Sequence, residues 1–227
     1  MQSNQKLIQS AFVRMMIVNM FVMMTSCLNS FIDNLIVGRI LGTDALAATG
    51  YFAPIATAVG FYNVIVLGVQ VLGGNFIGAG KKEKINSLFM SAFVFLGVLS
   101  AAFAAIGIVF RNDLSMILGA RGTVHEMLSG YIAGYMPGIP AQALSAMLMA
   151  MVSFNNDMRR SYISAVFLAV SNAAGDLLLS GMGTFGIGLA TTISGLIALF
   201  ILLPGYFRKD RVFHFTKSSQ LDFRERL

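Results

Sequence analysis

The sequence contains little charge, and long parts of it contain none. Asp, Glu, Lys and Arg make up 11% of the 227 residues, and hydrophobic residues make up 56%. Four stretches without any of these charged residues are 36, 26, 30 and 31 residues long: 45–80, 85–110, 127–156 and 177–207. A helix at the surface of a soluble domain carries polar side chains on one face, which stretches of this kind cannot supply. Because about 20 predominantly apolar residues cross a bilayer, the sequence predicts a polytopic membrane protein.

Side chains that commonly catalyse reactions or hold metals are also scarce. The single cysteine, Cys27, cannot form an internal disulfide and is expected to pack as a small side chain within an apolar stretch. Both histidines, His125 and His214, fall outside the apolar stretches, whereas an intramembrane serine protease needs a histidine inside a span. The sequence has no Gly-rich phosphate loop with its lysine and no cluster of metal ligands. It therefore predicts neither an enzyme nor a bound cofactor.

The apolar stretches predict an all-α fold, a bundle of six transmembrane helices. Strands of a membrane barrel alternate polar and apolar residues over about ten positions, whereas these stretches are apolar on every side. The second stretch is too long for one straight crossing, and Pro54 within it predicts a hinge or helix bend. The expected spans are residues 12–38, 45–76, 85–110, 127–154, 161–181 and 185–207.

These spans are expected to form one lobe over residues 1–207, followed by a basic cytoplasmic linker or tail over residues 208–227. The polar start of the chain and its long first apolar run differ from a cleavable signal peptide, so the first span is expected to remain as an anchor.

The basic residues predict the orientation of the bundle. If the N-terminus is cytoplasmic, thirteen of the sixteen Lys and Arg residues face the cytoplasm, and only Arg39, Arg111 and Arg121 face outside. We therefore expect a multi-pass protein of a bacterial cytoplasmic membrane, with both termini in the cytoplasm. The formal net charge of +6 is then explained mostly by the basic residues of the cytoplasmic segments. No nucleic-acid partner is expected, because such partners need a solvated basic surface.

Two carboxylates, Asp33 and Asp176, lie well inside the apolar spans. Each follows an asparagine by four residues, Asn29 and Asn172, so amide and carboxylate share a helix face. Ionisable groups in hydrocarbon normally face a bundle interior or a water-filled cavity. At about 1.5 Å of rise per residue, both carboxylates and Thr191 fall in the outer half of the membrane. They are predicted to line one cavity that takes up H⁺ or Na⁺; the alternative is that Asp33, or Asp176 as well, is solvated at the interface.

Other polar and polarisable residues have simpler interpretations. Tyr131 and Tyr135 are expected, like the other tyrosines near span ends, to act as interfacial anchors. Methionines such as Met147, Met149 and Met151 are expected to pack the bundle, or else to line an adaptable pocket for apolar ligands. Two dense glycine clusters are expected to bring helices into close contact, or to act as hinges: Gly73-Gly74 with Gly78 and Gly80, and Gly186-Ile187-Gly188 with Ala190.

Four segments together resemble signatures of the multidrug and toxic compound extrusion (MATE) transporters. Residues 31–48 (FIDNLIVGRILGTDALAA) resemble the end of the first helix of that family, and residues 75–82 (NFIGAGKK) the loop after its second helix. Residues 172–176 (NAAGD) resemble its helix-five motif, and residues 186–191 (GIGLAT) the start of its sixth helix. The segments occur in the same order and with the same spacing as in the family.

The resemblance implies one lobe of a two-lobe antiporter that exports amphipathic, cationic compounds in exchange for H⁺ or Na⁺. It implies that Asp33, Asn172, Asp176 and Thr191 couple the cation, and that Pro54 matches the proline of helix two. It identifies no metal other than a possible Na⁺ at the two carboxylates.

The length of the chain matches one lobe, so the resemblance implies a truncated or split half. The partners it implies are the lipid bilayer, a small-molecule substrate, and a second six-helix lobe or a second copy of this chain. Two other interpretations stay open at this point. One is a membrane-embedded substrate-binding subunit of a vitamin importer that works with separate ATPase subunits, and the other is a remnant that does not transport.

Overall fold

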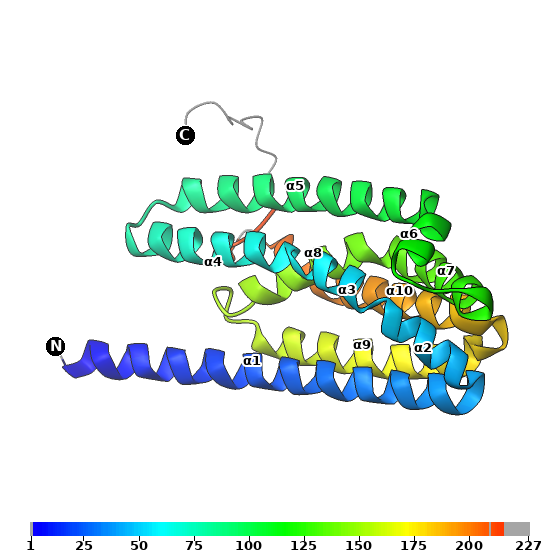
Figure 1. The fold of residues 1–227 in the computed structure, drawn as a ribbon. Helices are drawn as coiled ribbons and strands as arrows, with labels where there is room; N and C mark the ends of the chain where they lie inside the picture. Colours follow the sequence, from blue (N-terminus) through cyan, green and yellow to red (C-terminus); the bar gives the residue numbers. More distant parts are fainter. Residues whose placement is uncertain (1, 209, 216–227) are drawn as a thin grey trace.

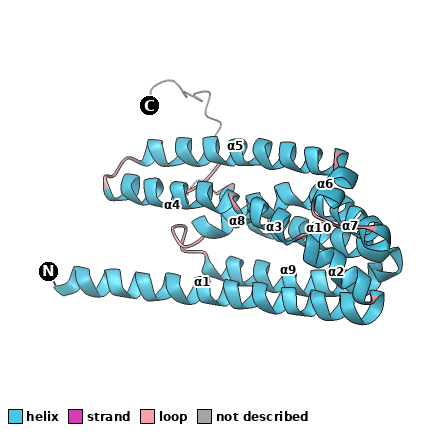
Figure 2. Cartoon of the chain, viewed as in Figure 1, coloured by secondary structure: helices cyan, strands magenta, loops and turns pink. Residues whose placement is uncertain are grey.

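The computed structural model describes residues 2–208 and 210–215 as a bundle of long, roughly parallel helices (Figure 1). The described residues contain helices, turns and loops but no strand (Figure 2). Most of the predicted basic tail, at residues 209 and 216–227, lies outside the described residues. The predicted all-α bundle of six long helical rods is confirmed.

The first rod is α1 (Gln2–Ile36), which continues into the π-helical turn η1 (Val37–Leu41). The rod ends at Gly42, whose φ of 89° lies in the left-handed region that favours glycine. This residue lets the chain reverse between the first and second rods.

The second rod is broken into three helices: α2 (Thr43–Tyr51), α3 (Ala53–Gly60) and α4 (Tyr62–Gly78). The first break falls at Phe52, and Pro54 lies in the first turn of α3. A proline is tolerated there because the first backbone N–H groups of a helix have no partner within it. A hinge motion at Pro54 stays a prediction.

The fourth rod consists of α7, η2 and α8 in succession, and the short α6 lies in the connection before it. The fifth and sixth rods are α9 and α10, which meet at η3. The elements after the second rod are α5 (Lys82–Val109), α6 (Arg111–Ile117), α7 (Gly122–Tyr135), η2 (Met136–Gly138), α8 (Ile139–Met151), α9 (Met158–Leu179), η3 (Ser180–Met182), α10 (Gly183–Leu202) and η4 (Leu203–Tyr206).

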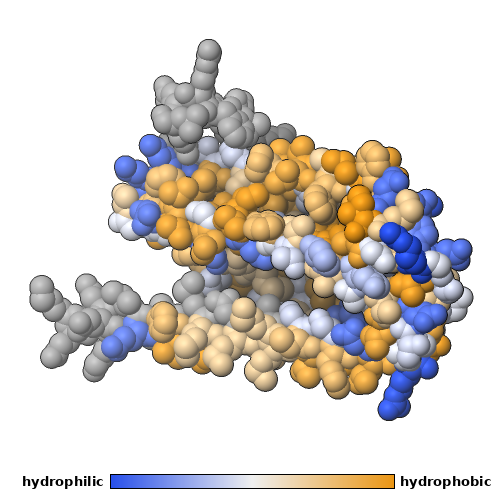
Figure 3. All heavy atoms as spheres, viewed as in Figure 1, coloured by the Kyte–Doolittle hydropathy of each residue, from blue (hydrophilic) through white to orange (hydrophobic). Residues whose placement is uncertain are grey.

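Three helical stretches of the described residues are long and apolar enough to cross a membrane: Thr43–Gly78, Lys84–Val109 and Met158–Tyr206. The last of these contains two rods, α9 and α10. Large apolar side chains cover much of the outer surface of the long helices, and polar residues gather toward the ends of the bundle (Figure 3). This distribution suits a bundle surrounded by lipid.

The connections between rods gather at two ends of the bundle. The turn between α4 and α5, the turn between α8 and α9 and the segment after η4 lie at the end where α1 begins (Figure 1). The connections after α1, α5 and α9 lie at the opposite end. The long rods therefore alternate in direction, as successive membrane crossings require.

Helix α10 lies at the centre of the bundle and packs closely on α7. A Cβ atom added to Gly188 would lie 2.5 Å from the carbonyl oxygen of Tyr131, and one added to Gly134 would collide with the carbonyl oxygen of Phe185. Thr192 Oγ1 donates a hydrogen bond to the carbonyl oxygen of Gly134 at 2.7 Å. The two backbones thus touch directly, which supports close packing as the role of Gly188.

Candidate functional site

A cavity of about 570 Å³ lies between α1 on one side and the rods of α2–α4 and α8 on the other. In the space-filling view, the surface is hollowed between the layer that contains α1 and the layer above it (Figure 3). The volume lies within the range of about 300–1,000 Å³ that is usual for small-molecule sites. On α1 the polar wall is formed by Thr25, Ser26, Asn29, Ser30 and Asp33, whose spacing places them on one face of the helix.

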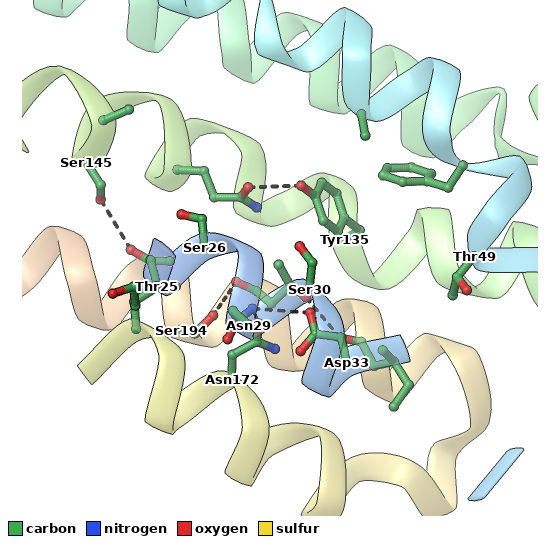
Figure 4. A pocket seen from close by; sticks show the side chains of 18 of the residues that line it. Thr25, Ser26, Asn29, Ser30, Asp33, Thr49, Tyr135, Ser145, Asn172 and Ser194 are labelled. Atoms are coloured by element: carbon green, nitrogen blue, oxygen red, sulfur yellow. Dashed lines mark hydrogen bonds between the residues drawn. The ribbon is translucent and has the colours of Figure 1, made fainter. Parts of the chain in front are cut away.

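Two asparagines connect the carboxylates of α1 and α9. Asn29 Nδ2 donates hydrogen bonds to Asp33 Oδ2 at 3.2 Å and to Asn172 Oδ1 at 2.6 Å (Figure 4). Asn172 Nδ2 donates in turn to Asp176 Oδ1 at 3.4 Å. Each helix supplies an amide one turn before a carboxylate, and the packing of α1 on α9 joins the two pairs. The result is one chain of polar groups from Asp33 to Asp176.

This polar chain is buried and incompletely satisfied. Asn172 is 1% exposed and Asp176 is 0% exposed, while Asp33 is half-buried. Three buried oxygens have no hydrogen-bond partner among the described residues: Asn29 Oδ1, Asp33 Oδ1 and Asp176 Oδ2. Native proteins rarely leave such atoms unpaired, because their desolvation is costly. The cluster therefore presents three unpaired oxygen acceptors.

The same cluster holds two carboxyl groups, those of Asp33 and Asp176, which are linked through Asn29 and Asn172. No Lys or Arg side chain is among the described residues that line the cavity. Because like charges within one buried cluster repel each other, a bound proton or a bound cation would stabilise the pair. Oxygen atoms of carboxylates and amides are suitable ligands for hard cations.

The other residues predicted for the site lie in different places. Thr191 lines the cavity, but its Oγ1 donates to the carbonyl oxygen of Ile187, at 3.3 Å within its own helix. Asp176 lies behind Asn172 rather than in the cavity wall, against the expectation that both carboxylates line it. Asp33 does line the cavity, as predicted. Pro54 is not among the lining residues, although Ala53 and Ala56 of the same helix are.

An aromatic and amide wall opposite α1 was not expected from the sequence. The ring of Phe52 lies 5.0 Å from that of Tyr131 and 4.7 Å from that of Tyr135. Tyr135 OH donates to Gln142 Oε1 at 3.0 Å, while Gln142 Nε2 is buried without a partner in the described chain. The interpretation of Tyr131 and Tyr135 as interfacial anchors is therefore wrong. Their spacing, with Gln142 eleven residues after Tyr131, places all three on one face of the fourth rod, a signal that the sequence does contain.

The methionines of α8 divide between two environments. Met149 lines the cavity, whereas Met147 and Met151 are fully buried in the core on the other side of the helix. Residues two positions apart on a helix point in different directions. Packing therefore describes Met147 and Met151, whereas a pocket for apolar ligands at Met149 stays a prediction.

Comparisons with known proteins agree on one family. A family model described as MatE matches residues 19–178. The probable multidrug resistance protein YoeA of Bacillus subtilis (strain 168) is 28% identical over 183 residues, which cover 77% of this chain and 39% of that protein. A FAD transporter of Shewanella oneidensis is 28% identical over 202 residues, which cover 86% of this chain and 44% of that protein.

Solved structures share the fold. A crystal structure of MATE in the bent conformation matches with a TM-score of 0.82 at 22% identity, over 92% of this chain and 47% of that one. The chain therefore spans less than half the length of the curated relatives and of the solved structure that it matches.

Proposed function

We propose a function from one premise: this chain belongs to the MatE family, whose members are membrane transporters and not enzymes. We propose that the lobe binds H⁺ or Na⁺ at Asp33 and Asp176, and that this binding is coupled to the export of amphipathic organic cations. The observation that carries the proposal is the buried chain of Asp33, Asn29, Asn172 and Asp176 beside a cavity of about 570 Å³.

The unpaired oxygens support particular roles for these residues. Asn29 Oδ1, Asp33 Oδ1 and Asp176 Oδ2 are available to a cation, while the Asn172 amide holds Asp176 in place. A single proton bound by the carboxyl pair relieves the repulsion between the Asp33 and Asp176 carboxylates. H⁺ and Na⁺ therefore compete for one site, which is the basis of an exchange cycle. Thr191 offers a hydroxyl oxygen to a ligand in the cavity.

The cavity favours a cationic ligand. It carries the carboxylate of Asp33 and no cationic side chain among its described lining residues, and Phe52 and Tyr135 offer aromatic rings to a cation. One relative is named a FAD transporter, but phosphate recognition normally uses Arg or Lys. This lobe does not supply them to its cavity from the described residues. The family match also favours a transporter lobe of this family over a vitamin-importer subunit.

Export further requires a second lobe. Secondary transporters with two bundles alternate access by rocking one bundle against the other around a central site. The chain spans less than half the length of its relatives, so we propose that a second six-helix lobe completes the cleft. That lobe can be continuous with this sequence, a separate chain, or a second copy.

We also propose that the end of the bundle where α1 begins faces the cytoplasm, because the basic residues concentrate there. In a Cys27→Ser background, a cysteine at the exposed Asp113 on α6 should react with an impermeant thiol reagent added to intact cells. A cysteine at the exposed Asn156, in the α8–α9 turn, should react only after the cells are permeabilised. The opposite pattern would reverse the orientation.

The proposed coupling can be tested on the purified chain in lipid nanodiscs. Ethidium binding is measured by fluorescence at acidic, neutral and alkaline pH, in NaCl and in matched choline chloride. We expect affinity to fall as pH falls, because protons occupy the carboxyl pair; a further loss in NaCl alone would identify Na⁺ as a competitor. The exposed Asp44→Asn variant serves as the control and should behave like wild type. Ethidium binding independent of both pH and Na⁺ would exclude coupling at this site.

A further inference from the structure

The segment that follows η4 folds back onto the bundle. Residues 210–215, which we call the strap, cross the end where α1 begins, and Phe213 within them is 0% exposed. The ring of Phe213 lies 5.6 Å from that of Phe89 on α5 and 5.5 Å from that of Phe154 in the α8–α9 turn. A Cβ atom on Gly73 of α4 would come within 2.7 Å of the Phe213 ring. Gly73 thus forms the floor of a socket for Phe213.

Hydrogen bonds hold the strap on both sides of this socket. Asn155 accepts from the Phe213 amide through Oδ1 at 2.8 Å and donates through Nδ2 to the Phe213 carbonyl oxygen at 2.9 Å. The Phe215 amide donates to the carbonyl oxygen of Tyr206 at 2.8 Å. The His214 amide donates to Asn86 Oδ1 on α5 at 3.2 Å. The strap therefore contacts α4, α5, η4 and the turn between α8 and α9.

Charged groups add a third attachment at the α8–α9 turn. Arg211 of the strap pairs with Asp157 Oδ2 at 3.1 Å and also donates to the carbonyl oxygen of Asn155. Arg160 of α9 pairs with the same carboxylate oxygen at 3.2 Å and donates to the carbonyl oxygen of Ile201 at 3.3 Å. One carboxylate thus joins the strap, the turn and the end of α10.

Helix α8 connects the strap to the cavity, because one face of the helix lines the cavity and another packs in the buried cluster that contains Phe213. One face, with Gln142 and Met149, lines the cavity. The opposite face, with Met147 and Met151, belongs to the buried cluster that Phe213 completes. Two further bonds fix the helix: Tyr206 OH donates to the carbonyl oxygen of Leu148, and Gln70 Nε2 of α4 donates to that of Ala150 at 3.2 Å. The strap and the cavity wall are therefore connected through α8.

We infer that the strap is a latch: it holds the α4–α5 hairpin against the α8–α9 turn, and Phe213 must leave its socket before this end of the cavity can widen. The inference concerns access to the cavity and does not depend on which ion or compound the lobe binds. Well-packed clusters shift between discrete arrangements rather than deforming continuously. In the proposed latch, the two arrangements are Phe213 in its socket with the Asn155 hydrogen bonds formed, and Phe213 released with those bonds broken.

The latch is tested on the full chain in nanodiscs, with Cys27→Ser and a reporter cysteine at Met149 in the cavity wall. Two rates are measured without any ion gradient or substrate. One is hydrogen exchange of the strap peptide by mass spectrometry, and the other is reaction of the reporter with a bulky maleimide. Asn155→Ala removes both bonds to the Phe213 backbone, and Phe213→Leu keeps an apolar side chain in the socket. Val212→Ala, at an exposed strap position, is the matched control.

We expect slow exchange of the strap in the parent protein and in Val212→Ala. Asn155→Ala should raise both rates roughly tenfold or more, because the loss of two hydrogen bonds increases the population with the strap released. Phe213→Leu should raise both by a smaller factor, and it replaces Asn155→Ala if that variant does not fold. Unprotected exchange of the strap in the parent protein would overturn the latch. Faster exchange with an unchanged reporter rate would overturn its coupling to the cavity. Either failure would leave the proposed cation site untouched.

Discussion

Asp176→Asn is expected to abolish cation binding by the lobe while leaving its fold intact. The substitution keeps the shape of the side chain and an oxygen that can accept from Asn172, but removes the negative charge. A bound cation and the Asp176 carboxylate form a buried pair of opposite charges, and removing one partner of such a pair costs about 3–5 kcal/mol. Every 1.4 kcal/mol is roughly tenfold in affinity. Affinity should therefore fall at least about 100-fold. The measurements are Na⁺ binding by isothermal titration calorimetry and proton release when ethidium binds.

Two other variants make this result specific. Asp33→Asn should cause a loss of the same kind, because the two carboxyl groups form one site. Asp113→Asn, which neutralises an exposed carboxylate on α6, should bind cations like the parent protein. Circular dichroism and thermal unfolding verify that each variant is folded. A folded Asp176→Asn variant with unchanged cation binding would remove Asp176 from the site.

Residues 1–227 expressed alone are expected to give no resistance to ethidium or norfloxacin in an efflux-deficient bacterium. A single lobe supplies one side of the cleft that alternating access requires. Co-expression of a second six-helix lobe from a family member should restore export. Export is measured as drug accumulation in cells and as growth in the presence of drug. Cells that express this lobe alone should show no detectable resistance, whereas cells that express both lobes should show clear resistance, because the second lobe completes the cleft.

The oligomeric state decides how this second result is interpreted. The chain is purified from the same cells, and its mass in detergent is measured by light scattering. A second copy can act as the second lobe, so resistance from a dimer agrees with the proposal of a two-lobe transporter. Strong resistance from a strictly monomeric chain would contradict it. The Asp176→Asn variant, co-expressed with the second lobe, is the control for export that depends on the proposed site.

The sequence by itself determined the membrane character, the helical class and the pairing of polar groups within each helix. Stretches of up to 36 residues without charge leave no soluble alternative, and a helix satisfies every backbone group within a single span. The four-residue spacing of Asn29 and Asp33, and of Asn172 and Asp176, likewise needs only the geometry of one helix. These properties are local, so they can be read from the chain directly.

Only the tertiary structure decided which faces of the helices meet. A span that is apolar all round carries no pattern that marks its buried side, so the sequence did not show that α1 packs on α9. That contact joins Asn29 to Asn172 and leaves Asp176 behind the cavity wall. The inward position of Tyr135, in contrast, is marked in the sequence by its spacing from Tyr131 and Gln142 on one helix face. Helix contacts in lipid depend on close packing and on a few polar bonds between distant segments, and these exist only once the helices have assembled.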